Sequence, residues 1–181
     1  MKFLAISGSL RKGSYNSALL RAVKALAPAE HSVELVSAEE VRALPLFDQD
    51  LEASAYPESA TALKARIREA DAVIVSTPEF NRSIPGALKN LLDWSTRPYG
   101  DNPWAGKPVY VMGASSGQIS AALAQYDLKK ILLYFNARVM GQPEFYMGPA
   151  GGKFDEALNL TDEKTKEAVV KAFAAFSEFA K

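Results

Sequence analysis

Short apolar runs alternate along the chain with longer stretches of helical periodicity. Continuous runs rich in β-branched residues, such as Ala72-Val73-Ile74-Val75, are typical of strands that helices cover on both faces. Strands are predicted at 2–7, 32–37, 71–76 and 107–113, with a weaker pattern at 137–141. Helices are predicted at 15–27, 58–69, 85–96, 118–135 and 161–180.

Residues at the helix boundaries support these ranges. Asn16 or Ser17 can cap the first helix, and Pro85 suits a first helical turn. Thr161 with Lys164 forms an imperfect capping box for the last helix. We expect each of these residues to mark the beginning of a helix.

The alternation of strands and helices predicts an α/β fold. No Pro/Gly-rich linker divides the chain, so residues 1–181 are expected to form a single domain. We predict a flavodoxin-like doubly wound sheet of about five parallel strands in the order 2-1-3-4-5, with helices on both faces. Two long connections are expected, 38–57 over the sheet edge and 142–153. Ligands in such sheets bind beyond the carboxyl ends of the strands, so the loops of interest are 7–16, 77–84 and 113–118.

Composition narrows the function classes. Lys plus Arg equals Asp plus Glu, 21 each, so no bulk charge points to a nucleic acid or to an anionic membrane. The chain has no cysteine, which excludes disulfides, thiol catalysis and thiolate metal sites. No window of about 18 apolar residues suits membrane insertion. We expect a cytoplasmic protein with no nucleic-acid partner and no bound metal.

The segment SGSLRKGSYN at 7–16 joins the first strand to the first helix. Gly8 and Gly13 complete neither the dinucleotide fingerprint G-x-G-x-x-G nor the P-loop motif. The segment is rich in donors and leads into a helix N-terminus, which favours anions. Three polar residues and one cation can aim at a single phosphate: Ser9, Ser14, Asn16 and Arg11. The alternative is a solvated turn whose hydroxyls cap the helix, but the position at this junction favours a phosphate site.

The other two loops also carry polar groups. Pro78 and Pro85 bracket the second loop and make it rigid, which suits the binding of a flat polar ring. Phe80 can stack on that ring or pack in the core. Glu79 can contact a ligand or solvent, and Asn81 can bond a ligand or its own backbone. The third loop offers hydroxyls and unhindered amides from Ser115, Ser116 and Gly117. Gln118 can reach a ligand, but a surface position in the first turn of the next helix is the favoured interpretation.

Four segments together resemble the NADPH-dependent FMN reductase family, which includes small cytosolic quinone, chromate and azo-dye reductases. The segments are GSLRKGSYN (8–16), LPLFDQDLE (44–52), TPEFNRSIPGALKNLLDW (77–94) and GASSG (113–117). The resemblance extends from residue 2 to about 140. It departs from the family at Phe80, where tyrosine is common, at Arg82, where an aromatic is frequent, and at Ile119-Ser120-Ala121, where many members have paired glycines.

The resemblance implies FMN as cofactor and NADPH or NADH as co-substrate. It implies that the first loop holds the FMN phosphate and that the other two loops contact the isoalloxazine. The matching positions are Ser9, Arg11, Ser14, Tyr15 and Asn16 in the first loop, Pro78, Glu79, Phe80 and Asn81 in the second, and Ser115, Ser116 and Gly117 in the third. It also implies a homodimer or homotetramer; in the chain itself the apolar run 131–135 indicates either core packing or such an interface.

The implied activity is transfer of hydride from NAD(P)H through the flavin to a small acceptor such as a quinone, with chromate and azo compounds as further candidates in vitro. The flavin carries this chemistry, so no protein group is expected to be catalytic. His31, the only histidine, is expected at the surface. The alternatives are a flavodoxin-like electron carrier and a non-catalytic flavin sensor. Such carriers are usually acidic, so the balanced charge favours the enzyme.

Overall fold

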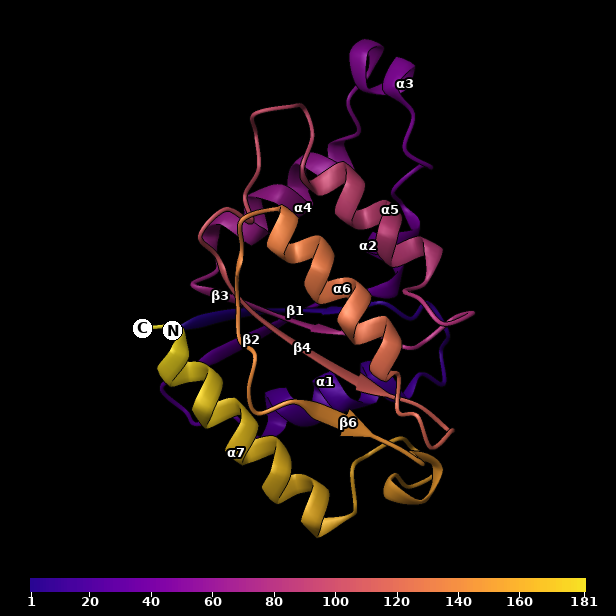
Figure 1. Cartoon of the computed structure of the whole chain (residues 1–181), viewed down its shortest axis with the longest axis vertical. Helices are drawn as coiled ribbons and strands as arrows, with labels where there is room; N and C mark the ends of the chain where they lie inside the picture. The colour runs from indigo at the N-terminus through magenta and orange to yellow at the C-terminus, as the bar shows by residue number, and fades with distance from the viewer.

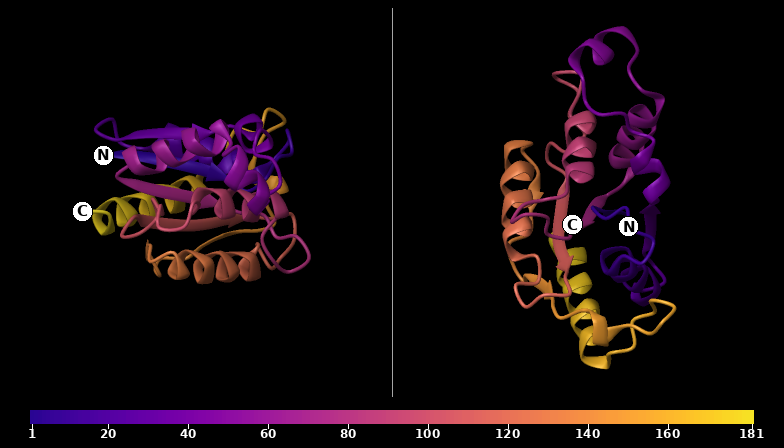
Figure 2. Two further views of the ribbon diagram at one scale, coloured as in Figure 1. Left: turned by 90° about the horizontal axis from the view of Figure 1, so that it is seen from above. Right: turned by 90° about the vertical axis from the view of Figure 1, so that its right-hand side faces the viewer.

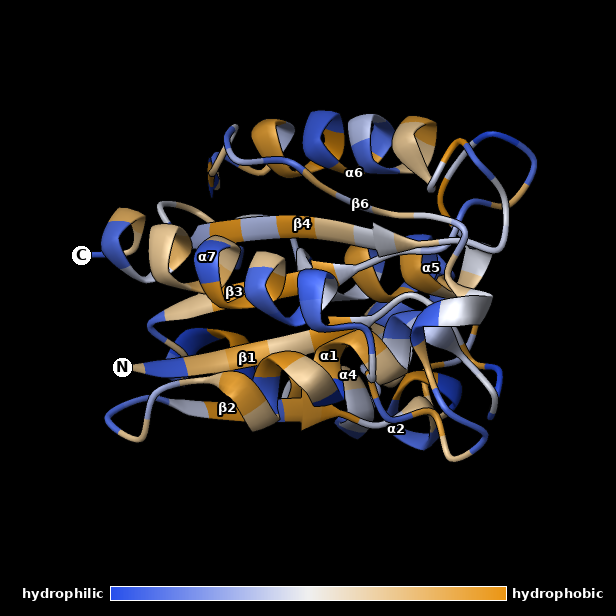
Figure 3. Ribbon diagram, turned by 90° about the horizontal axis from the view of Figure 1, so that it is seen from below, coloured by the Kyte–Doolittle hydropathy of each residue, from blue (hydrophilic) through white to orange (hydrophobic).

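The computed structural model describes residues 1–181 and contains one six-stranded sheet. The strands are β1 (Lys2–Ser7), β2 (Ser32–Val36), β3 (Ala72–Ser76), β4 (Pro108–Ala114), β5 (Arg138–Val139) and β6 (Phe145–Met147). All pairings are parallel, and the order β2-β1-β3-β4-β5 confirms the prediction. Figure 3 shows β2, β1, β3 and β4 side by side, with their arrowheads at the same edge.

The helices form a layer on each side of the sheet (Figure 1). They are α1 (Tyr15–Leu26), α2 (Ala38–Arg42), α3 (Gln49–Ser54), α4 (Glu58–Glu69), α5 (Gly86–Ser95), α6 (Ala122–Tyr134) and α7 (Glu163–Phe179), with a 3₁₀ turn, η1, at Gly151–Lys153. α4, α5 and α6 cover one face, whereas α1 and α7 cover the other. No helix in the structure has both the length and the apolar character needed to cross a membrane.

Successive side chains of each strand point to opposite faces of the sheet, so the interior is divided into two cores. In β1, Leu4 and Ile6 pack under α4 and α5, while Phe3 and Ala5 pack under α1 and α7. All four side chains are almost fully buried. A strand buried on both faces has no polar face, which explains why β1, β3 and β4 are continuous apolar runs.

The two long connections contain more structure than the sequence predicted. Residues 38–57 include α2 and α3, and residues 142–153 include β6 and the 3₁₀ turn. A capping box between Ser37 and Glu40 begins α2, whereas α3 has no buried residue and extends from the body of the protein (Figure 2). The segment between them docks on α5, because the Trp94 indole and the Asn90 amide both donate to the Pro45 carbonyl. These elements are too short for periodicity to reveal them.

Several predicted helix boundaries were wrong. Ser14, not Asn16 or Ser17, caps α1 by accepting a hydrogen bond from the Ser17 amide. Asp162 caps α7 in the same way, in place of the Thr161 box. In each case a polar residue nearby in the sequence fits the cap equally well, and backbone geometry decides between them.

The beginnings of α5 and α6 also differ from the prediction. Pro85 is the residue that precedes α5 rather than part of its first turn. α6 begins at Ala122, four residues later than predicted, because Ser120 and Ala121 have φ of 58° and 62°. That left-handed backbone cannot belong to an α-helix.

His31 is half-buried rather than a surface residue. Its ring packs edge-on against Phe3, with 5.5 Å between ring centroids, and lies 5.8 Å from Phe173. Its Nδ1 lies 3.3 Å from the amino group of Met1. His31 therefore helps to close the core at the amino end of β1, far along the strand from the three loops.

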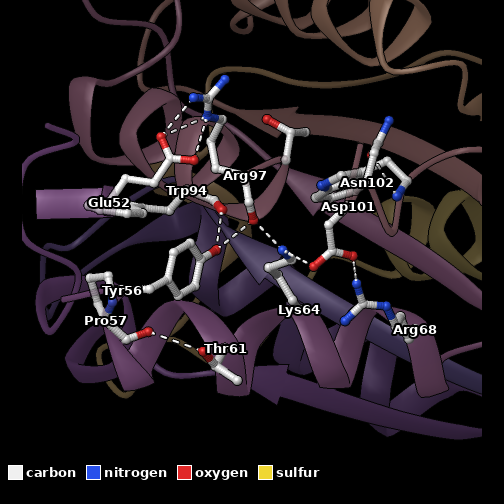
Figure 4. Close-up of polar contacts among 12 residues, drawn as sticks. Glu52, Tyr56, Pro57, Thr61, Lys64, Arg68, Trp94, Arg97, Asp101 and Asn102 are labelled. Atoms are coloured by element: carbon white, nitrogen blue, oxygen red, sulfur yellow. Dashed lines mark hydrogen bonds and ion pairs between the residues drawn. The ribbon is translucent and has the colours of Figure 1, made fainter. Parts of the chain in front are cut away.

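A polar network anchors α4 to the connection that follows α5 (Figure 4). The Lys64 side chain is 3% exposed; its ammonium group lies 2.6 Å from the Asp101 carboxylate and also donates to the Arg97 carbonyl. Arg68 forms a second ion pair with Asp101. The Tyr56 hydroxyl lies 2.7 Å from the same Arg97 carbonyl, and burial raises the pKa of Tyr56 to about 12. The network satisfies a buried ammonium group that would otherwise be costly.

Candidate functional site: three loops at the carboxyl edge

The three candidate loops begin at one level of the sheet. Ser7 pairs with Ser76, and Ser76 pairs with Met112 in the register of β1, β3 and β4. The Gly8 amide donates to the Ser76 carbonyl at 2.8 Å, and the Thr77 amide donates to the Met112 carbonyl at 3.0 Å. The sheet therefore brings the three loops together at its carboxyl edge, where ligands bind in this architecture.

Asn16 ties the strand ends together beneath the loops. Its amide nitrogen donates to the Ala114 carbonyl at 2.9 Å, and its oxygen accepts from the Ala114 amide at 2.9 Å and from the Ser76 hydroxyl at 2.8 Å. The side chain is buried. These bonds engage both polar ends of the side chain, so what Asn16 offers a ligand is its backbone amide.

The first loop keeps many donors free. The backbone amides of residues 10–14 have no acceptor within the protein. The Ser9 hydroxyl has no protein partner either, and Ser14 uses its oxygen as an acceptor and retains a proton to donate. Arg11 is exposed, and its guanidinium lies 5.6 Å from the centre of the Tyr15 ring, which stacks on Phe154. Free amides, hydroxyls and a guanidinium are the donor set that binds phosphate.

The second loop is a tight turn. Phe80 and Ser83 exchange two backbone hydrogen bonds of 2.9 and 3.0 Å, and the two residues between them, Asn81 and Arg82, have φ of 50° and 67°. Positive φ at both central positions is the geometry of a type I′ turn. Phe80 lies at the edge of this turn, 58% exposed. Its ring is therefore available to a ligand, as the stacking interpretation requires.

Glu79 joins the second loop to α6. Its carboxylate accepts hydrogen bonds from the Leu123 and Ala124 amides at 3.1 and 3.3 Å. α6 has no cap from its own sequence, because Ala121 occupies the capping position. Ser83 adds a second link by donating to Asp127 at 2.7 Å, and this bond, with that of Lys130, holds the pKa of Asp127 below its usual value. Sequence reasoning missed this role because the cap comes from 44 residues away.

The third loop is held between β4 and β6. The Ser115 amide donates to the Met147 carbonyl at 2.8 Å, and the Ser115 hydroxyl accepts from the Gly117 amide at 3.1 Å. A Cβ atom on Gly148 would lie 2.5 Å from the Gly117 carbonyl, so the close approach of this loop requires glycine there. Ser116, Gly117 and Gln118 are exposed. Gln118 is thus at the surface, as predicted.

Two departures from the family pattern have exposed side chains, Arg82 in the second loop and Ile119 after the third. Arg82 is exposed, and its guanidinium lies 3.5 Å from the Glu79 carboxylate. Ile119, which precedes α6, and Leu123, in the first turn of α6, are both about half-exposed. The surface beside the second and third loops therefore combines one cation with aliphatic side chains.

The sheet is doubly wound, and a donor-rich loop follows its first strand, beside a rigid turn and a serine-glycine loop. These features together are typical of a flavodoxin-like nucleotide-binding protein. The chain matches the sequence model of the NADPH-dependent FMN reductase family over residues 1–152. It belongs to that family and is an oxidoreductase with FMN as cofactor and NAD(P)H as co-substrate. The resemblance drawn from the four segments is confirmed.

Individual relatives support the same family assignment. The chain is 40% identical over 167 residues to a 2-hydroxy-1,4-benzoquinone reductase from a Burkholderia species, covering 92% of this chain and 89% of that one. The flavoenzyme FerB from Paracoccus denitrificans, an NAD(P)H:(acceptor) oxidoreductase, superposes with a TM-score of 0.89 at 41% identity, covering 99% and 96% of the two chains. A flavodoxin from Pseudomonas aeruginosa shares the fold, with a TM-score of 0.56 at 20% identity over 97% and 98% of the chains.

The residues present fit FMN. Its phosphate needs several donors and a positive charge, which the free amides of residues 10–14 and Arg11 supply. Its isoalloxazine needs a flat wall and donors for its polar edge. The half-exposed ring of Phe80 and the unpaired amides of Asn81 and Ser116 provide these.

Proposed function

We propose that this oxidoreductase reduces quinones and that the three loops hold its FMN. The observation that carries the proposal is the row of unpartnered amides at residues 10–14, at the level where two further donor-bearing loops emerge. The quinone as acceptor rests on the relatives, one of which is a 2-hydroxy-1,4-benzoquinone reductase.

We assign the first loop to the phosphate. Ser9, Arg11 and Ser14 bind it through side chains, Tyr15 flanks it, and Asn16 holds the loop against β4. Pro78 to Asn81 form one wall of the isoalloxazine site, and Ser115 to Gly117 bind its pyrimidine end. Bound FMN supplies the redox chemistry by accepting hydride from NAD(P)H and passing it to the acceptor. The second and third loops would orient the ring, and the two substrates would use it in turn.

We also propose a homo-oligomer, a homodimer or a homotetramer, that works in the cytoplasm, where NAD(P)H is available. Leu132 and Phe135 are buried in the core, which accounts for part of the apolar run 131–135. Leu133 and Tyr134 are 63% and 86% exposed, however, and Tyr126 is exposed on the same helix. An apolar surface of this kind favours contact with another subunit.

The test combines a spectrum with turnover. The purified protein should carry oxidised flavin, released as FMN on denaturation, and should oxidise NADPH with 1,4-benzoquinone without any added reductase. A flavoprotein that requires a separate reductase for turnover would be a carrier and would refute the proposal. A flavoprotein that NADPH does not reduce and no reductase turns over would be a sensor and would also refute it.

A further inference from the structure

A pocket opens beside the first loop, toward β2. It has a volume of about 300 Å³ and lies between the first loop, α1, the end of β2 and α2. Four cations line it, namely Arg11, Lys12, Arg21 and Arg42, against one carboxylate, Glu39. The whole chain has a formal net charge of zero, so the excess of positive charge is a local property of this pocket. A concentration of positive charge in a concave site attracts an anion.

This pocket shares only Arg11 with the proposed FMN phosphate site. Ser9, Ser14 and Asn16 do not line it. Its hydroxyls come from Ser7 and Ser17, which are hydrogen-bonded to each other at 2.9 Å, and from Ser37. Apolar side chains complete the lining: Leu10, Leu20, Leu35 and Val36. The pocket thus offers apolar surface for a flat or sugar-like group as well as charge for an anion.

The cations of this pocket differ in the contacts that they make within the protein. Arg42 donates to the Leu10 carbonyl and pairs with Glu39 at 3.2 Å, so it braces the first loop against α2. Lys12 and Arg21 have no carboxylate partner and no hydrogen bond within the protein. Both are exposed. These two side chains can therefore close on an anion without breaking any contact of the fold.

We propose that this pocket binds the adenosine 2′-phosphate of NADPH. The inference rests on the proposed function, since it assumes that NADPH reduces FMN held by the loop next to it. A phosphomonoester carries close to two negative charges at neutral pH, which match Lys12 and Arg21. NADPH and NADH differ only in this group, so the pocket makes the enzyme prefer NADPH.

The test uses Arg21→Gln and Arg21→Glu in the FMN-loaded protein. Loss of one charge-assisted contact at an exposed site should raise KM for NADPH about 10-fold, with the glutamate variant more severe, and kcat unchanged. KM for NADH should stay within about twofold. Lys171→Gln and Lys171→Glu, which change an exposed lysine of α7 that has no partner, are matched controls and should leave both values unchanged.

A binding measurement separates this proposal from the activity. In calorimetric titrations, 2′,5′-ADP should bind to the FMN-loaded protein at least about 10-fold more tightly than 5′-AMP, and Arg21→Glu should abolish the difference. Equal KM changes for NADPH and NADH, or inorganic phosphate competing as well as 2′,5′-ADP does, would overturn the proposal. If the protein binds 2′,5′-ADP in this way but NADPH never reduces its flavin, the pocket stands and the proposed function fails.

Discussion

At the scale of single residues, the side chains of the first loop have two different tasks. Ser14 and Asn16 hold the loop in place, through the cap of α1 and the bonds to Ala114 and Ser76. Ser9 and Arg11 have no hydrogen bond within the protein through their side chains and are free for a ligand. The hydrogen bonds of Ser14 and Asn16 therefore fix the loop, and Ser9, Arg11 and the remaining hydroxyl proton of Ser14 can bind a ligand.

Arg11→Ala tests this division. Because a charge-assisted hydrogen bond contributes about 1.5–3 kcal/mol, FMN should bind about 10- to 150-fold more weakly. Riboflavin, which lacks the phosphate, should be hardly affected, and Arg11→Lys should give an intermediate loss, because it keeps the charge without the two-pronged geometry. The measurement is quenching of flavin fluorescence on titration of apoprotein. Equal losses for FMN and riboflavin would show that Arg11 does not contact the phosphate.

At the scale of elements, the second loop and α6 form one unit. Glu79 caps the helix from outside, and Ser83 bonds to Asp127 one turn further along. The helix N-terminus is favourable for the negative charge of Glu79. The position of the turn that presents Phe80 and Asn81 therefore depends on α6.

Glu79→Ala should lower the free energy of unfolding by about 0.5–2 kcal/mol, the usual cost of a lost helix cap, and should slow reduction of the flavin. Glu79→Gln, which keeps an acceptor oxygen, should show smaller losses in both. Thermal unfolding and anaerobic rapid mixing with NADPH measure the two effects, with exposed Glu156→Ala as control. If Glu79→Gln abolished reduction at an unchanged melting temperature, Glu79 would have a chemical role rather than a positioning one.

The sequence allowed prediction of those elements in which local pattern and burial agree. β1, β3 and β4 are continuous apolar runs, and their order and the position of the three loops followed from the fold class. The cap from Glu79 and the pocket at Lys12 and Arg21 were not predictable, because they join segments distant in the sequence. Side-chain partners, such as those of Asn16, likewise depend on tertiary packing rather than on residue type.

At the level of the whole molecule, the Lys64 network joins α4 to the connection that follows α5 (Figure 4). Hydrogen bonds from Lys64 and Arg68 hold the pKa of Asp101 below its usual value. A carboxyl group with a lowered pKa stabilises the fold above its ordinary pKa, and the contribution is lost as the pH falls through the lowered value. Stability should therefore decrease below about pH 4.

Asp101→Asn should remove part of that acid dependence. At pH 7 the variant should lose about 1–2 kcal/mol of unfolding free energy, because the buried ammonium of Lys64 keeps only a carbonyl partner. Near pH 2 the variant and the parent should be equally stable. Urea unfolding at the two pH values measures this, with exposed Glu167→Gln as control. A loss that is the same at both pH values would mean that the charge of Asp101 is not responsible.

If this chain binds FMN and passes hydride from NAD(P)H to a quinone, NADPH must reduce its flavin and a quinone must reoxidise it. Anaerobic stopped-flow measurement of the flavin absorbance tests both steps directly. Mixing with NADPH should bleach the bound flavin in a single turnover, and a second mixing with 1,4-benzoquinone should restore the absorbance at a rate no slower than steady-state turnover. Flavin that stays oxidised in the presence of both NADPH and NADH, or that quinone fails to reoxidise, would show that this chain does not carry out the reaction.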